Sequence, residues 1–242
     1  MSFTKAFVLS ALIISISSLV SERIPHENYD ILNPWSPDCP YDAHEVIEGF
    51  SVNMAMYYSW FASYARCHDS EITEGICCPN KFQTPNWKLI DHDFTEFTFN
   101  EEDYESNYII FKSDEYKKYA ISFTSTRGGF NQILEEVLDS ILIPVEEGSP
   151  ILIMDYAKYW FGKIQDKFFK EENLAEFRAH PDYQIIFTGH SLGGTTALLV
   201  AFYERYFPQY SFENNRKSVV VTMGQNRLGN GDFVDFVEPV VD

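Results

Sequence analysis

The sequence predicts an α/β protein folded as a single domain, and three observations support this prediction. Strand-like and helix-like segments alternate along the chain, as in a sheet covered by helices. A short apolar run after residue 182 leads through a glycine-rich turn into an apolar helix. The 242 residues are 45% hydrophobic and 22% charged, which is close to the globular average and sufficient for one sizeable core.

The N-terminal segment has the pattern of a secretory signal peptide. Lys5 precedes an uncharged, mostly apolar run over residues 6–20. This run is shorter than the roughly 20 residues that a membrane-spanning helix needs. We therefore expect cleavage after about residue 21, with residues 22–242 forming a secreted, extracellular domain that has no stable membrane span. A retained N-terminal anchor is the alternative.

Cysteine usage agrees with an oxidising compartment. The four cysteines are Cys39, Cys67, Cys77 and Cys78. An even number in a secreted chain favours two disulfides, with three possible connectivities, of which the vicinal pair is the least favoured. A zinc site is the rival interpretation, but no CxxC or HxxxH spacing supports it.

The charge balance excludes one class of partner. Eighteen basic residues stand against 36 acidic residues, for a formal net charge of −18. Such a chain repels phosphate backbones, so nucleic acid is not an expected partner. The acidic residues form small scattered clusters, such as Glu171 with Glu172, which indicates a solvated acidic surface.

The first half of the chain is predicted to contain one helix and three strands. Residues 44–65 carry apolar side chains around most of a helix, and residues 67–86 have the glycine and proline content of a loop. Residues 94–99 alternate between apolar and polar side chains as a strand does. Two further strand-like runs, 108–112 and 119–123, are predicted to form a hairpin across a polar turn at 113–115.

The second half alternates helices with buried strands. Apolar residues repeat at helical spacing over residues 130–141, and a longer helix is predicted across residues 156–168. Short apolar strands are predicted at 183–188 and 217–222, and a helix is predicted at 195–205.

The turn after the strand at 183–188 carries the chemistry. It reads Gly189-His190-Ser191-Leu192-Gly193, a G-x-S-x-G sequence in strand–turn–helix context, known as a nucleophile elbow. Glycine at positions 189 and 193 lets the strand and the helix approach closely. Ser191 then stands exposed at a helix N-terminus, where the Leu192 N–H is the natural oxyanion donor.

These residues resemble the class 3 (fungal-type) lipase family, in particular its secreted nematode-like branch. Besides the elbow, residues 223–230 (MGQNRLGN) are similar to the G-Q-P-R-V-G-N segment of the family, with Asn226 replacing proline and Leu228 replacing valine. Residues 121–126 (ISFTST) lie where the family has F-R-G-T, with Thr124 and Ser125 replacing arginine and glycine.

The resemblance implies an α/β-hydrolase fold and hydrolysis of carboxylic esters, in particular acylglycerols at a lipid–water interface. It implies no metal or organic cofactor. By position in the family motifs, Ser191 is the nucleophile, and Leu192 and Thr126 are the two oxyanion donors. Residues 130–141 occupy the place of a mobile lid helix in the family, although an ordinary helix covering the sheet is the equal alternative.

The catalytic acid and base are not identified by the sequence. In this fold the triad follows the order serine, acid, histidine. After Ser191 the 242-residue sequence contains Asp232, Asp235 and Asp242 but no histidine, and none of the three aspartates matches the acid position of the family.

All six histidines precede the nucleophile in the sequence. We interpret His190 as a buried structural residue. His180 is expected to end the helix before the nucleophile strand and so to lie at the wrong end of that strand. His44, His68 and His92 remain candidates for recruitment; the sixth is His26.

The resemblance therefore implies a sheet that lacks its C-terminal part. One explanation is an incomplete sequence of an ordinary lipase, and the other is a short secreted product that binds lipid, or acts as a decoy, without catalysis. A purely structural or interaction module has no positive feature in this sequence.

Overall fold

The computed structural model describes residues 52–65, 67, 86–99, 102–124, 141–212 and 218–241. These residues all belong to one compact unit, Ala43–Asp242. The signal segment, the segment at 130–140 and residues 44–51 of the predicted first helix lie outside the described residues. Cys67 is buried, and the other three cysteines lie outside the described residues, so the disulfide pairing stays a prediction.

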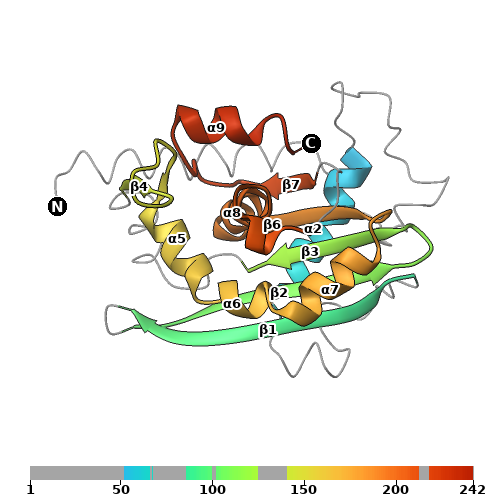
Figure 1. The fold of residues 1–242 in the computed structure, drawn as a ribbon. Coiled ribbons are helices and arrows are strands. Elements are labelled where there is room, and N and C mark those ends of the chain that lie inside the picture. Colours follow the sequence, from blue (N-terminus) through green and yellow to red (C-terminus); the bar gives the residue numbers. More distant parts are fainter. Residues whose placement is uncertain are drawn as a thin grey trace. The chain divides into compact units, whose positions relative to one another are not determined.

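A five-stranded mixed sheet forms the centre of this unit, in the order β1-β2-β3-β6-β7 (Figure 1). Antiparallel pairing joins β1 to β2 and β2 to β3, whereas β3, β6 and β7 are parallel. The five predicted strands and the predicted hairpin are confirmed. Their bounds are β1 (Lys88–Phe99), β2 (Glu102–Ser113), β3 (Lys118–Phe123), β6 (Gln184–His190) and β7 (Val219–Met223).

The alternation of side chains along β6 explains why helices cover both faces of the sheet. Ile186 packs against α2 (Val52–Tyr64), and the Thr188 hydroxyl donates to the Tyr58 carbonyl at 3.3 Å. Ile185 and Phe187 point the other way, into the larger core with α8 (Leu192–Tyr206). A parallel strand buried on both faces carries a near-continuous apolar run, as Ile185, Ile186 and Phe187 do at the centre of β6.

The prediction of one continuous helix across residues 156–168 is wrong. The structure has two helices there, α5 (Asp155–Gly162) and α6 (Gln165–Phe168). Gly162 favours a helix end, and the Lys163 and Ile164 amides donate to the third carbonyl back, Trp160 and Phe161, which tightens the last turn and redirects the chain. The break lets Ile164 and Phe168 be buried in the same core.

Several short elements carried too weak a pattern to be predicted as separate units. The hairpin of β4 (Leu142–Pro144) and β5 (Leu152–Met154) has strands of three residues each. The others are the 3-10 turn η2 (Pro208–Tyr210) and α9 (Gly231–Val237). The helix expected to end at His180 is present as α7 (Glu171–Ala179). None of the helices in the described ranges is both long and apolar enough to cross a bilayer.

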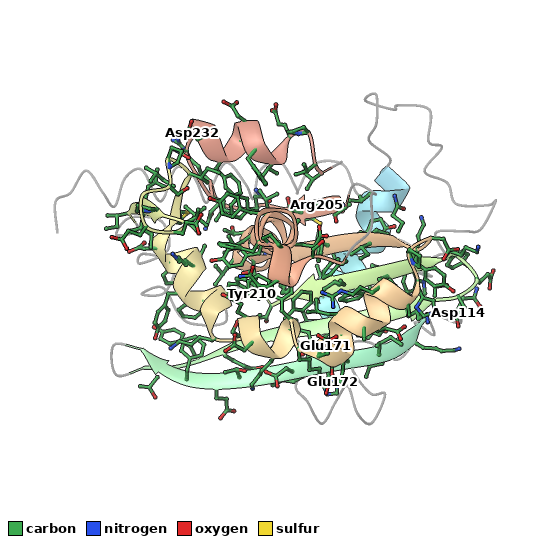
Figure 2. The ribbon with its side chains drawn as sticks, viewed as in Figure 1. Asp114, Glu171, Glu172, Arg205, Tyr210 and Asp232 are labelled. Carbon is green, nitrogen blue, oxygen red and sulfur yellow. The ribbon has the colours of Figure 1, made fainter. Side chains whose placement is uncertain are left out.

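The acidic surface is visible at the start of α7. Glu171 and Glu172 are exposed on its first turn (Figure 2). Acidic side chains at a helix N-terminus are stabilised by the helix dipole, which gives this pair a structural role.

Candidate active site

Ser191 occupies a strained backbone turn between a strand and a helix. β6 ends at His190, α8 begins at Leu192, and Ser191 between them has φ 53° and ψ −123°. Positive φ is uncommon for a residue other than glycine, and such conformations typically cost about 1–3 kcal/mol. Within the described ranges only Lys117, in the turn after β2, shares this property. The predicted elbow geometry is present at Ser191.

The two glycines of the motif allow backbones to touch on both sides of Ser191. A Cβ on Gly189 would lie 2.2 Å from the Gly193 carbonyl carbon. A Cβ on Gly193 would lie 2.3 Å from the carbonyl oxygen of Phe123 and 2.7 Å from that of Thr124. The first contact shows that the end of β6 lies directly against the first turn of α8. The second brings the end of β3 directly against the start of α8.

The segment after β7 is tied to the elbow by hydrogen bonds. The Ser191 N–H donates to the Met223 carbonyl at 2.9 Å, and the Asn226 N–H donates to the Thr195 hydroxyl at 3.3 Å. Residues 223–226 therefore lie beside the first turn of α8. The two family-like segments, far apart in sequence, form one local structure.

Leu192 places an amide at the N-terminus of α8. As the first helical residue it has no intrahelical acceptor for its N–H, and the first turn of α8 contains no acidic side chain. The helix dipole therefore favours negative charge at this point. The Leu192 side chain itself is 2% exposed and packs among Tyr104, Tyr156 and Trp160.

Thr126, the expected second oxyanion donor, lies outside the described residues. Thr124, two residues earlier, is buried, and its N–H donates to the Asn107 carbonyl at 3.1 Å. This bond extends the β2–β3 pairing to the point where β3 meets Gly193.

The interpretation of His190 as a buried residue is wrong, because the structure leaves its side chain exposed. Ile186 and Thr188 on the same face of β6 are covered by α2, and His190 is the next residue on that face, at the very end of the strand. Position at the tip of the strand, rather than membership of the motif, decides its exposure.

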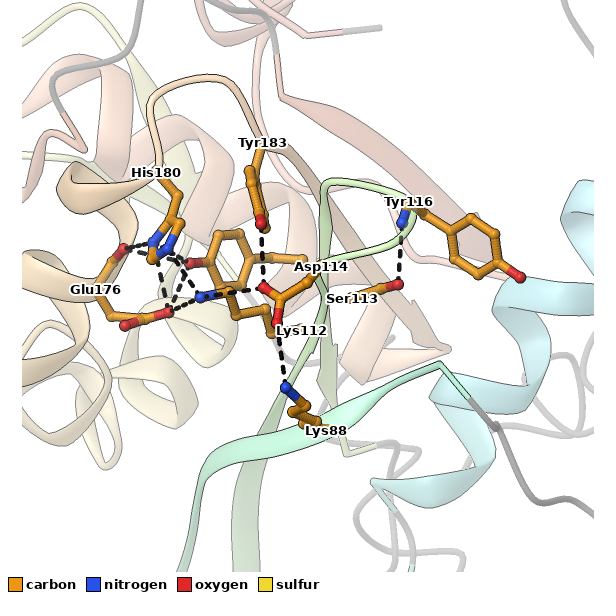
Figure 3. A network of polar contacts seen from close by, with 9 residues as sticks. Lys88, Lys112, Ser113, Asp114, Tyr116, Glu176, His180 and Tyr183 are labelled. Carbon is orange, nitrogen blue, oxygen red and sulfur yellow. Dashed lines mark hydrogen bonds and ion pairs between the residues drawn. The ribbon is translucent and has the colours of Figure 1, made fainter.

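His180 is engaged in a network at the opposite end of the sheet (Figure 3). Its Nε2 accepts from the Lys112 ammonium at 2.9 Å, and its Nδ1 lies 3.0 Å from the Tyr119 hydroxyl. Tyr119 is paired with Ile185, six residues before Ser191, which corresponds to about 20 Å of strand. The expectation that His180 lies at the wrong end of β6 is met.

The same network lowers the pKa of the Glu176 carboxylate. Burial acts to raise the pKa of Glu176, but hydrogen bonds from Lys112 and Tyr119 outweigh it and hold the pKa below its ordinary value. The cluster thus consists of mutually satisfied groups and joins α7 to β2 and β3.

His92 is too far from the elbow to act on Ser191. It lies opposite Ile109 on β2, and Ile109 lies opposite Ser122 on β3. Ser122 in turn lies opposite Thr188 on β6. Three strand spacings of about 4.8 Å place His92 roughly 14 Å from β6, beyond the reach of an imidazole. His26, His44 and His68 lie outside the described residues.

The described aspartates after Ser191 are surface residues of α9. Asp232, labelled in Figure 2, and Asp235 are both exposed. Asp232 accepts a hydrogen bond from Asn230 at 3.0 Å. Asp242 lies outside the described residues. Over the described ranges, no group of three or more His, Cys, Asp or Glu side chains is arranged to hold a metal ion.

Comparisons with known proteins agree with this geometry. The model of the family described as lipase (class 3) matches residues 111–242. A lipase of Rhizomucor miehei is 27% identical over 165 residues, covering 66% of this chain and 44% of the relative. A lipase of Rhizopus niveus is 28% identical over 185 residues, covering 74% and 44%. The chain thus spans less than half the length of these curated relatives.

Solved structures show the same fold. A fungal lipase–inhibitor complex, described as a model for interfacial activation, superposes with a TM-score of 0.60 at 25% identity, covering 78% of this chain and 67% of that one. The triacylglyceride lipase of Rhizomucor miehei superposes with a TM-score of 0.61 at 23% identity, with the same coverages. The fold is that of the α/β-hydrolases, as the resemblance implied.

The family model covers more than half of the chain, from near the end of β2 through the elbow to the last residue. It includes the end of β3, which lies against Gly193, and Met223, which accepts from the Ser191 N–H. This chain belongs to the class 3 lipase family.

Proposed function

We propose that the protein hydrolyses carboxylic esters of lipids, in particular acylglycerols, with Ser191 as the nucleophile. The backbone of Ser191 carries the proposal: a positive φ between a parallel strand and a helix N-terminus is the conformation that exposes a nucleophile. Membership of the class 3 lipase family supports the choice of a lipid ester as substrate. A lipid–water interface is accordingly the proposed place of action.

The chemistry follows from the positions of the groups. The Ser191 Oγ adds to the ester carbonyl carbon while a base takes its proton, and the carbonyl oxygen becomes an oxyanion. The Leu192 N–H and the N-terminal end of α8 stabilise that charge. The carbon–oxygen bond to the alcohol then breaks, the alcohol leaves with the proton, and water hydrolyses the acyl-serine to the acid.

Thr126 is proposed as the second oxyanion donor. The end of β3 contacts Gly193 through Phe123 and Thr124. Thr126 follows Thr124 by two residues, a stretch of chain that spans at most about 7 Å, so the chain length permits its hydroxyl to reach the elbow. A distance above about 10 Å between Thr126 and Ser191 in an experimental structure would contradict this role.

The decisive experiment measures hydrolysis of p-nitrophenyl esters by the 242-residue polypeptide beside a Ser191→Ala control. We expect weak or no turnover, because neither His92 nor His180 reaches the elbow and general-base assistance is worth roughly 10²–10⁴ in rate. Adding imidazole supplies a base in solution. The rate of the wild-type sequence should then exceed that of Ser191→Ala under identical conditions.

The possible outcomes separate the hypotheses. A Ser191-dependent rate that appears with imidazole supports the nucleophile and its oxyanion donors. A strong Ser191-dependent rate without imidazole would also support the nucleophile, but would show that a histidine outside the described residues acts as the base. Equal rates for the two proteins with and without imidazole would contradict ester hydrolysis and leave binding of lipid without catalysis.

Secretion is part of the proposal. Residues 1–21 are proposed to be removed, and the four cysteines to form two disulfides. N-terminal sequencing of secreted material should begin between about Ser18 and Arg23. Recovery of intact Met1 from a membrane fraction would contradict cleavage.

A further inference from the structure

The Leu192 amide belongs to the first turn of α8, which hydrogen bonds fix only in part. The Ser191 carbonyl accepts from the N–H groups of Gly194 at 2.9 Å and Thr195 at 3.1 Å, which defines the start of α8. The Leu192 N–H takes no part in these bonds and, as the first helical N–H, has no intrahelical acceptor. Terminal turns of helices are the part that opens first. Immobility of this amide therefore depends on what holds the Leu192 side chain.

An aromatic cluster holds that side chain. We define it as Tyr104, Tyr156 and Trp160, which are 5%, 6% and 1% exposed and form one buried group with Leu192. The Trp160 ring stacks on Tyr156 with 4.6 Å between centroids and meets Tyr104 edge-on at 5.2 Å. These pairs are the stacked and edge-to-face geometries that aromatic rings favour.

The aromatic cluster connects the elbow to two elements far from it in sequence. Tyr156 and Trp160 belong to α5, whereas Tyr104 belongs to the part of β2 that extends beyond its pairing with β3, which begins at Tyr108. The carbonyl of Trp160 also accepts a hydrogen bond from the buried Ser106 hydroxyl of β2, at 3.5 Å. Trp160 is thus held in place by its own helix and by β2, within the same buried group as Leu192.

From this geometry we infer that Trp160, supported by Tyr104 and Tyr156, is a positioning residue that immobilises the Leu192 amide at the elbow. The inference rests on the proposed function for its catalytic meaning, since it assumes that this amide receives the oxyanion. Trp160 acts through Leu192 rather than by touching the substrate. Removing the indole while keeping an apolar side chain should free the first turn of α8 without unfolding the domain.

The test measures motion of one amide by ¹⁵N relaxation on the 242-residue protein without substrate. The wild-type Leu192 N–H should have an order parameter near 0.85, the value of rigid backbone, and Trp160→Leu should lower it toward 0.6 or below. Ring-current effects change the chemical shift but not the order parameter, so this readout separates motion from simple loss of a ring. Tyr156→Leu is the second variant and should show a smaller fall.

The matched control is Phe169→Leu. Phe169 is 6% exposed, and its ring stacks on Tyr210 with 4.4 Å between centroids. The substitution therefore removes a comparably buried, stacked ring that belongs to a different cluster. The Leu192 order parameter should stay at its wild-type value in this variant. If Trp160→Leu does not fold, the Leu192 order parameter is compared in two other variants, Trp160→Phe and Tyr156→Leu. Trp160→Phe retains an aromatic ring at this position.

Two results would overturn the inference: an unchanged Leu192 order parameter in both Trp160→Leu (or Trp160→Phe) and Tyr156→Leu, or an equal fall in Phe169→Leu. A second readout links it to catalysis. In the imidazole-assisted assay Trp160→Leu should lower kcat at least about tenfold with little change in KM, because loss of oxyanion stabilisation acts on the transition state. Absence of any Ser191-dependent rate would refute the proposed function, while the relaxation result would still decide the role of Trp160.

Discussion

Replacing Gly193 by alanine is the sharpest test of how the elbow is assembled. The new Cβ would lie 2.3 Å from the Phe123 carbonyl oxygen, whereas real Cβ contacts essentially never fall below 3.0 Å, so at least 3.0 − 2.3 = 0.7 Å of movement is required. The obstructing atoms are backbone atoms of β3 and cannot rotate away. The variant must therefore part the end of β3 from the start of α8.

The magnitude follows from this obstruction. Overpacking in a well-packed interior costs about 1–3 kcal/mol, and a clash between backbones belongs at the upper end of that range. For a domain of this size each kcal/mol lowers the melting temperature by roughly 2–4 °C, so Gly193→Ala should melt about 6–12 °C below the wild-type protein. Thermal unfolding followed by circular dichroism measures this directly.

Gly162→Ala is the matched control. Gly162 is the last residue of α5, and an added Cβ there would meet nothing within 4 Å. Alanine is favoured over glycine in a helix by up to about 1 kcal/mol, so this variant should melt at or slightly above the wild-type temperature. Equal melting temperatures for Gly193→Ala and the wild-type protein would refute the close approach of β3 to α8.

Two further variants test strain and electrostatics. Ser191→Gly should be more stable than Ser191→Ala by about 1 kcal/mol, because glycine adopts the positive φ of this position without strain. Urea unfolding measures the difference. A Ser191→Gly protein that unfolds at the same urea concentration as Ser191→Ala, or at a lower one, would contradict a strained elbow. Burial acts to raise the pKa of Asp91, but hydrogen bonds from Lys170, Tyr108 and Asn173 outweigh it and hold the pKa below its ordinary value of 3.8. The stability from this ionised group is therefore complete above about pH 4 and is lost as the pH falls through the lowered pKa. Urea unfolding should show Asp91→Asn less stable than wild type at pH 7, with the difference narrowing at pH 3; a constant difference would contradict the linkage.

The positions of the strands along the chain and the place of the elbow could be predicted because they depend on local patterns. The apolar run of β6 must be buried on both faces, and the five residues from Gly189 to Gly193 leave few backbone conformations between a strand and a helix. The predicted hairpin followed from two strand-like runs on either side of a polar turn. Each of these features is decided by neighbours within a few residues.

The errors came from features that depend on distant parts of the chain. The break between α5 and α6 lets Ile164 and Phe168 enter a core whose shape is set by β3 and α8. The exposure of His190 depends on how far α2 extends along the sheet. Neither the length of a neighbouring helix nor the shape of a core is encoded in the periodicity of the segment itself.

The chemistry of the elbow can be read from local sequence: a serine between two glycines, at the end of an apolar strand and the start of an apolar helix. The surroundings of the elbow depend instead on the tertiary structure. Phe123 and Thr124 meet Gly193, and Tyr104, Tyr156 and Trp160 enclose Leu192, although these residues come from segments far apart in the chain. The physical reason is that backbone strain and helix capping act over a few bonds, whereas close packing joins whichever surfaces the folded chain brings together.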